Sequence, residues 1–358
     1  MKVIDMHCDT ISEILSAREC GENMILRKND RMVDLVKMKK GSYSVQNFAL
    51  FVELKKGENP YHRVNRLLDV FKEEMDCNQE WIRQVYSTSD ILQNEAAGRL
   101  SALLTVEEGG VCEGKTENLY ALYEQGVRMM TLTWNFPNEL GYPNFSPNRD
   151  CYTPNTEDGL TETGIRFVEE MERIGMIIDV SHLSDAGFYD VLRYTKRPFV
   201  ASHSNARAVC PWVRNLTDDM IRKLAERGGV IGLNYCAEFL RDSVKHESDK
   251  QFGQTEKCLK GGINPADQEL QGFGRRPKVG YASLEDIARH ARHMAQVGGI
   301  ECVGLGSDFD GIPPHPELAG ADEIPKLAEA FVKEGFHERE IDQILYGNVF
   351  RVYRDILG

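Results

Sequence analysis

The sequence lacks several patterns that would each define a class of protein. Its nine cysteines are scattered and include no Cys-x-x-Cys pair, so we expect reduced thiols in a cytoplasmic protein, with neither a disulfide scaffold nor a cysteine zinc knuckle. No run of about 18 apolar residues occurs, and the first residues contain no apolar signal segment, so we expect no membrane span and no secretion. No Gly-x-Gly-x-x-Gly follows a predicted strand, which disfavours a dinucleotide-binding fold.

Positive charge is also scarce. The chain has 43 lysines and arginines against 56 aspartates and glutamates, a net charge of −13. Nucleic acids and anionic membranes attract basic surfaces, so neither is an expected partner. Hydrophobic residues make up 41% of the chain and charged residues 28%, which is typical of a globular protein with a large core.

Short apolar runs alternate with amphipathic helical patterns along the whole chain. Near-continuous apolar runs are typical of parallel strands that are buried on both faces. Eight alternations predict a closed barrel or a doubly wound sheet, and the missing dinucleotide motif favours the barrel. We therefore expect residues 1–358 to form a single (β/α)₈ (TIM) barrel domain of the α/β class. The predicted strands are Val3–Met6, Ser44–Val52, Ser101–Val106, Val127–Thr133, Met176–Val180, Phe199–Ser202, Val230–Asn234 and Cys302–Gly306.

Helical patterns separate the strands, and two of them have recognisable first residues. Ser283 with Asp286 predicts a capping box, and Thr217 is a predicted N-cap. Predicted helices cover Val64–Cys77, Asp90–Gly98, Glu117–Gln125, Thr161–Ile174, Asp185–Tyr194, Asp218–Arg227 and Ser283–Val297. The last helix contains His290 and His293, which we expect to be solvated on the outer ring.

Two segments are too long for a bare barrel. Asn135–Gly159 follows the fourth predicted strand, and Cys236–Tyr281 follows the seventh. Barrels build their active sites from the loops after the strands. We therefore expect both extra loops to form pocket walls or lids.

Five of the eight predicted strands end in a histidine or a carboxylate. In a barrel these ends converge on one small volume. Buried charge is costly unless it is paired or bound to metal. Two divalent metal ions, with one carboxylate bridging them, would balance such a cluster. The residues concerned are His7 and Asp9, Glu107 and Glu108, His182, His203, and Asp308 with Asp310.

The first of these motifs has a defined geometry. His7 and Asp9 are two residues apart, so both side chains point to one side of an extended strand and can hold one metal. His-x-Asp alone is a weak signal. A single histidine such as His182 or His203 is commonly a hydrogen-bonded core residue. The convergence of all five strand ends therefore carries the prediction.

Taken in order, these motifs resemble the membrane dipeptidase (renal dipeptidase) family of zinc peptidases, in a soluble bacterial form. The resemblance runs through nearly the whole chain. Its landmarks are residues 5–10 (DMHCDT), 106–110 (VEEGG), 126–128 (GVR), 131–133 (TLT), 178–182 (IDVSH), 202–204 (SHS), 214–215 (RN) and 306–311 (GSDFDG).

The resemblance implies a binuclear zinc site with two Zn²⁺ per chain. It implies that His7 and Asp9 hold one zinc and that His182 and His203 hold the other. Glu107 is implied to bridge both metals together with a water or hydroxide. Glu107 fits this role better than Glu108 because of its distance from the Gly-x-Arg landmark at 126–128.

The resemblance also implies residues that handle the substrate. Arg214 matches the arginine that binds the C-terminal carboxylate, a task that suits its planar fork. Asp308 matches the aspartate that moves protons beside the bridging water. Asp179 and Asp310 are expected to be structural or to support the ligands.

The chain departs from the family at the end of the fourth strand. Many members have a histidine there, whereas this chain has Trp134 followed by Asn135, and we expect both to line the substrate site. An indole donates one hydrogen bond but carries no charge, so Trp134 is expected to form an apolar wall. Phe239 occupies the position of a tyrosine that some members use near the carboxylate.

The predicted activity is therefore hydrolysis of L-Xaa–L/D-Xaa dipeptides, with a small dipeptide as the partner. A related amidohydrolase acting on a cyclic amide, lactam or ester is the first alternative, but those barrels usually begin His-x-His. A barrel that only binds a small molecule is the second alternative. A homodimer is compatible with the sequence, which fixes no oligomeric state.

Overall fold

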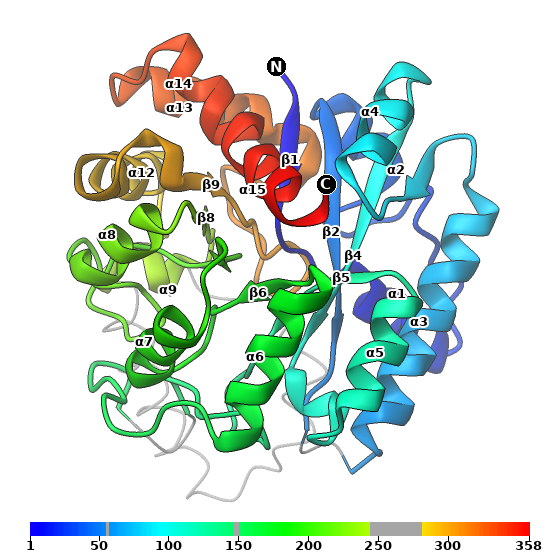
Figure 1. Ribbon diagram of the computed structural model, residues 1–358. Helices are drawn as coiled ribbons and strands as arrows, with labels where there is room; N and C mark the ends of the chain where they lie inside the picture. Colours follow the sequence, from blue (N-terminus) through cyan, green and yellow to red (C-terminus); the bar gives the residue numbers. More distant parts are fainter. Residues whose placement is uncertain (55–56, 147–149, 244–280) are drawn as a thin grey trace, which may run out of the picture.

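The structure, a computed structural model, describes residues 1–54, 57–146, 150–243 and 281–358. Parallel strands close into a barrel that is surrounded by helices (Figure 1). The order around the barrel is β2-β1-β9-β8-β7-β6-β5-β4, and pairing of β2 with β4 closes it. The predicted (β/α)₈ fold is confirmed.

Each predicted strand coincides with one barrel strand, although most observed strands are shorter. Regular pairing stops just before the polar residues at most strand ends, because the chain there turns into the loops. The barrel strands are β1 (Val3–Asp5), β2 (Tyr43–Phe51), β4 (Leu100–Glu107), β5 (Val127–Thr131), β6 (Ile177–Asp179), β7 (Val200–Ala201), β8 (Val230–Leu233) and β9 (Val303–Leu305).

One further strand, β3 (Ile82–Gln84), was not predicted. It pairs with Leu100–Ala102 at the start of β4, whereas β5 pairs with the second half of β4. Three residues with one apolar side chain give no measurable periodicity, so the sequence pattern could not indicate this strand.

Helices cover the barrel and follow the predicted segments closely. Ser283 and Asp286 form the predicted capping box, and Thr217 accepts a hydrogen bond from Met220 N. The α-helices are α1 (Thr10–Glu19), α2 (Leu35–Lys40), α3 (Pro60–Cys77), α4 (Thr88–Ala96), α5 (Thr116–Glu124), α6 (Glu162–Ile174), α7 (Asp185–Tyr194), α8 (Asp218–Glu226), α9 (Ala237–Leu240), α12 (Leu284–Gly298), α13 (Ile324–Lys333), α14 (Glu338–Asp342) and α15 (Asn348–Leu357). Short 3₁₀ or π turns are η1 (Gly109–Cys112), η2 (Ile300–Cys302), η3 (Ala321–Glu323) and η4 (Gln343–Gly347).

Helix α15 closes the end of the barrel at which β1 begins (Figure 1). Its apolar residues pack against a cluster that takes side chains from β1, β2, β4, β5, β6, β7 and β8. Tyr353 on this helix is buried, and its hydroxyl donates to Asn47 Oδ1 at 2.8 Å. Because apolar side chains fill this end of the barrel, we expect the functional site at the opposite end, where the strands finish.

The loop after β5 lies across that opposite end. Asn144 N donates to His182 O at 2.8 Å, and Pro143 pairs with Leu183. The long loop after β8 begins with α9. Its residues 244–280, for which a lid was predicted, lie outside the described residues.

The prediction for His290 is wrong. This side chain is fully buried: Ala206 N donates to Nδ1 at 3.0 Å, and Nε2 donates to Leu240 O at 3.1 Å. The cause is α9, which packs on α12 and covers this part of the helix. His293 is partly exposed and pairs with Asp218 at 2.7 Å. Within the described residues, no helix combines the length and apolarity needed to cross a membrane.

We predict that Thr217→Ala lowers the free energy of unfolding by about 1 kcal/mol, because the first turn of α8 loses the acceptor for Met220 N. Thr217→Ser keeps that oxygen and should remain close to wild type. Urea denaturation of the two variants measures the difference. Equal stability of the alanine and serine variants would contradict the capping role.

Candidate active site

The strand ends bring the predicted ligands together at one end of the barrel. His7 and Asp9 follow β1, Glu107 ends β4, and His182 and His203 follow β6 and β7. All five residues are buried, with exposed fractions of 8% or less. Three buried imidazoles and two buried carboxylates in one volume require a balancing charge.

Glu107 lies between two groups of ligands. Its Oε2 is 3.2 Å from His7 Nε2. Its Oε1 is 3.0 Å from His182 Nε2 and 3.5 Å from His203 Nε2. One carboxylate thus presents a separate oxygen to each side, which is the arrangement of a bridging ligand.

The two histidines beyond Glu107 face each other with the same ring nitrogen. His182 Nε2 and His203 Nε2 are 3.0 Å apart. His182 Nδ1 donates to Asn135 Oδ1 at 2.9 Å, and His203 Nδ1 donates to Ser202 Oγ at 2.7 Å. With both protons on Nδ1, two lone pairs point at each other. This contact becomes favourable when a cation lies between them.

The second group surrounds His7. Its Nε2 lies 3.4 Å from Asp9 Oδ2 and 3.7 Å from Asp308 Oδ1. His7 Nε2 and Asp9 Oδ1 are buried atoms without a hydrogen-bond partner among the described residues. His7 with Glu107 and His203, and His7 with Asp9 and Asp308, both have spacings that could hold a metal ion. The donor set of imidazole and carboxylate suits zinc and similar divalent ions.

The pKa shifts differ among the three histidines, because each imidazole experiences a different balance of burial and neighbouring charge. Burial, and then the charge of Arg214, lower the pKa of His182 to about 3. Burial, and then the charge of His7, lower the pKa of His203. Burial opposes the effect, but the Glu107 and Asp9 carboxylates raise the pKa of His7 well above its ordinary value. Neutral His182 and His203 are the forms that bind metal.

Asp179 holds the histidines after β6 and β7 in place. Its Oδ1 accepts hydrogen bonds from Ser181 N (3.0 Å) and Ser202 N (2.8 Å), and its Oδ2 accepts from Ser202 Oγ and Thr131 Oγ1 (both 2.6 Å). The hydroxyl proton of Ser202 is therefore used on Asp179, so Ser202 must accept from His203. The expected supporting role of Asp179 agrees with these contacts.

Asp5 likewise holds the residues that follow β1 and β9 in place. Its Oδ1 accepts from Ser307 N at 2.9 Å and from His7 N at 3.3 Å, which ties β1 to β9. Asp310 is also supporting: its Oδ2 accepts from Thr10 Oγ1 and its Oδ1 from Met32 N.

Asn234 is a site residue that the sequence did not indicate. Its Nδ2 donates to Asp308 Oδ2 at 2.9 Å, and its Oδ1 accepts from Cys236 N. The second Asp308 oxygen is left facing His7. Asn234 was already inside a predicted strand, but nothing in the pattern marks one asparagine as special.

Arg214 is 4% exposed and only weakly held. Its Nη2 donates to His203 O at 3.2 Å and its Nη1 to Ser204 Oγ at 3.4 Å, while Nε has no hydrogen-bond partner among the described residues. The guanidinium lies 5.4 Å from the Phe239 ring, which offers no hydrogen bond. A buried guanidinium with free donors suits an anion such as a carboxylate.

Trp134 and Asn135 line the same end of the barrel. The Trp134 ring is 4.9 Å from Phe51, 5.7 Å from Phe136 and 6.2 Å from His182. Trp134 is partly exposed, and its role as an apolar wall stays a prediction. The Asn135 amide oxygen accepts from His182 Nδ1 at 2.9 Å and so orients this predicted ligand.

Glu108 points away from the ligands. Its carboxylate accepts from Gly110 N at 2.7 Å, from Trp134 N at 3.1 Å and from Asn138 Nδ2. Its backbone has φ of +97°, and His182 and Asp308 also have positive φ values of +69° and +62°. Non-glycine residues in this region are uncommon and gather at functional sites.

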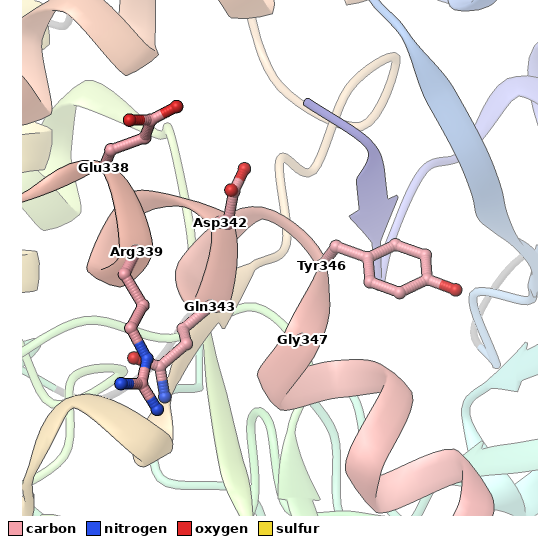
Figure 2. Close-up of a pocket in the computed structure, with 6 residues that line it drawn as sticks. All are labelled: Glu338, Arg339, Asp342, Gln343, Tyr346 and Gly347. Carbon is pink, nitrogen blue, oxygen red and sulfur yellow. The ribbon is translucent and has the colours of Figure 1, made fainter.

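A surface pocket lies elsewhere, along α14 and η4 (Figure 2). It is lined by Glu338, Arg339, Asp342, Gln343, Tyr346 and Gly347. Tyr346 is 5.3 Å from the Lys2 ammonium, beside the start of β1. The pocket is thus at the opposite end of the barrel from the ligands and takes no part in the site.

The fold and the site are typical of one class: a metal-dependent hydrolase with candidate metal ligands at the C-terminal ends of barrel strands. The sequence model of the family described as membrane dipeptidase (peptidase family M19) matches residues 1–357. The chain belongs to this family. It is a metallo-dipeptidase, a hydrolase that acts on peptide bonds.

Individual relatives agree with this assignment. The chain is 30% identical over 281 residues to an uncharacterized protein in the pqqA 5' region of Klebsiella pneumoniae, covering 77% of this chain and 89% of the relative. It is 28% identical to dipeptidase aclJ of Aspergillus oryzae, covering 90% of this chain and 70% of the relative. The crystal structure of dipeptidase AC, a metallopeptidase of family M19, has a TM-score of 0.83 and 25% identity, covering 100% of this chain and 99% of that chain.

We predict that Gly311→Ala weakens metal binding by about 10- to 100-fold, the range seen when groups that orient ligands are disturbed. A Cβ at this position would lie 2.2 Å from Asp9 Oδ2 and 2.8 Å from Asp308 Oδ1. Titration of the metal-free protein with zinc measures the change. Gly347→Ala is the control, since its Cβ would meet nothing closer than 3.8 Å. Equal affinities for the two variants would show that Gly311 is not needed for ligand placement.

Proposed function

We propose that the enzyme binds two zinc ions per chain and hydrolyses dipeptides of the form L-Xaa–L/D-Xaa. The observation that carries this proposal is the position of Glu107, whose two oxygens face different histidines. In the proposed site, His7 and Asp9 hold one ion, His182 and His203 hold the other, and Glu107 bridges them. Zinc bound there would lower the pKa of water and polarise the scissile carbonyl.

Arg214 binds the C-terminal carboxylate of the substrate in this proposal. Its burial, its free Nε and its position beside His203 support the role. A carboxylate would satisfy donors that the protein leaves partly unused, and a guanidinium can bind it with two parallel hydrogen bonds. A site that binds the C-terminal carboxylate in this way selects a peptide with one residue after the scissile bond.

Asp308 moves the proton between the attacking water and the leaving amine. One of its oxygens is fixed by Asn234, and the other faces His7. Its side chain is 14% exposed, more than the carboxylates of Asp9 and Glu107, so it is open towards the place where substrate would lie. A carboxylate so placed can accept a proton and pass it on.

Acceptance of a D-residue at the C-terminal position was predicted from the family resemblance, and one related structure supports including it. A metallopeptidase from Rhodobacter sphaeroides was solved with a phosphinate mimic of the dipeptide L-Ala-D-Ala, and it shares the fold with a TM-score of 0.82 and 24% identity, covering 99% of each chain. For this chain, we propose that Trp134 forms the apolar wall beside the substrate, and that Asn135 orients His182 there.

We propose a cytoplasmic location, because seven of the described cysteines carry free thiols: Cys8, Cys20, Cys77, Cys112, Cys210, Cys236 and Cys302. We further propose a homodimer, which sedimentation analysis would test. A monomer at micromolar concentration would rule it out.

The protein reconstituted with zinc should contain close to two ions per chain and should hydrolyse L,L and L,D dipeptides. Elemental analysis and a dipeptide panel measure both properties. Removal of the metal with a chelator should abolish turnover, and added zinc should restore it. Zinc-loaded protein that hydrolyses lactams or esters but no dipeptide would overturn the proposed substrate class.

Asp308→Asn should keep its metal and lose most of its turnover, by about 100-fold or more, because the amide cannot take up a proton. The amide is close in size to the carboxylate, so zinc content serves as the internal check on the site. Full turnover by this variant would remove the proton-transfer role.

A further inference from the structure

Arg214 is carried by the loop 206–216, whose two ends are joined by the backbone. Arg207 N donates to Leu216 O at 2.8 Å, and Leu216 N donates to Asn205 O at 2.8 Å. Compact loops with joined ends are held by their own side chains. The position of Arg214 therefore depends on what fixes the inside of this loop.

The Arg207 side chain spans the loop. Its Nε donates to Asn215 O at 2.8 Å, and its Nη2 donates to Val213 O at 3.0 Å. These two carbonyls flank Arg214 along the chain. Because a guanidinium holds its N–H groups in one rigid plane, Arg207 fixes both carbonyls relative to each other.

Asp185, the first residue of α7, holds Arg207 in turn. Arg207 Nη1 donates to Asp185 Oδ2 and Nη2 donates to Oδ1, both at 2.7 Å. Such a bidentate pair fixes orientation as well as distance. The Arg207 side chain is 14% exposed and that of Asp185 is 9% exposed, so the pair is largely shielded from water.

Asn144 joins this pair to the metal site. Its Nδ2 donates to Asp185 Oδ1 and to Val213 O (2.8 Å), and its own N donates to His182 O (2.8 Å). One residue from the loop after β5 thus contacts both the predicted metal ligand His182, through its backbone N, and Val213 beside Arg214, through its side chain. Asn144 is 3% exposed.

We propose that Asp185, Arg207 and Asn144 form a positioning network that sets the distance between Arg214 and the metal ligands. This inference rests on the proposed function, in which Arg214 binds the substrate carboxylate. In a dipeptide that carboxylate lies at a nearly fixed distance from the scissile carbonyl. The network therefore determines the preference for a free carboxylate one residue after the scissile bond. Buried ion pairs often contribute little net stability, so a contribution to folding stability does not by itself explain the Asp185–Arg207 pair.

The test compares kinetics on a dipeptide and on the same dipeptide with a C-terminal amide, using the full-length, zinc-loaded protein. Arg207→Lys keeps the positive charge beside Asp185 but loses the planar contacts to the two carbonyls. We expect its KM for the dipeptide to rise about 10- to 100-fold, because small displacements of binding groups have effects of this size. Its kinetics on the amide should change little, so the preference for the dipeptide falls.

Two further variants make the test decisive. Asp185→Asn should reduce the preference for the dipeptide in the same way. If an unpaired buried charge prevents the single variants from folding, the double variant Asp185→Leu, Arg207→Met replaces them, because it removes both charges of the pair. It too should show the reduced preference. Arg222→Lys is the matched control, because Arg222 lies in an exposed pair with Asp219 on α8. It should leave both substrates unaffected.

The outcomes separate the two proposals. An unchanged preference in folded, zinc-loaded Arg207 and Asp185 variants would overturn the network, and so would equal losses on dipeptide and amide. Arg214→Met defines the full loss of the preference. If wild-type protein cleaves no dipeptide, or if Arg214→Met keeps the preference, the proposed function fails instead.

Discussion

The site depends on one electrostatic constraint: lone pairs and negative charges are held together where water cannot screen them. His182 and His203 present unprotonated Nε2 atoms to each other at 3.0 Å, and Glu107 presents an oxygen to both. On the other side, His7 faces Asp9 and Glu107. An arrangement of this kind is costly in a low-dielectric interior unless cations occupy it. The Nδ1-protonated tautomers of His182 and His203, the buried aspartates and the loop contacts all hold this cluster in place.

Asp5 and Asp179 explain how short strands can hold such a cluster. Strands β6 and β7 pair through few residues, Asp179 with Val200, and β1 meets β9 through Asp5 and Leu305. Where the ladder is this short, a buried carboxylate accepts the backbone N–H groups beyond it, as Asp179 does for Ser202. Each aspartate thus replaces missing ladder hydrogen bonds: Asp179 fixes the residues before His182 and His203, and Asp5 fixes the backbone of His7 itself.

The sequence predicted the barrel and the gathering of its polar strand ends because both follow from periodicity. A candidate ligand such as His203 is recognisable by its place after an apolar run. The supports are not, since the contact of Asn234 with Asp308 joins residues 74 positions apart and follows no local pattern. His290 was misplaced for a similar reason: its helix face is covered by α9, a four-residue element with no strong periodicity. Tertiary contacts of this kind override local patterns.

Asparagine is the residue that recurs around the charged groups, and its chemistry gives a reason. Asn135 accepts from His182, Asn234 donates to Asp308, and Asn144 donates to Asp185. An amide can donate and accept hydrogen bonds without adding charge. A lysine or aspartate at any of these positions would place a charge beside the group that the asparagine contacts and would shift the pKa of that group. Neutral supports therefore let the protein orient its charged groups without changing the net charge of the site.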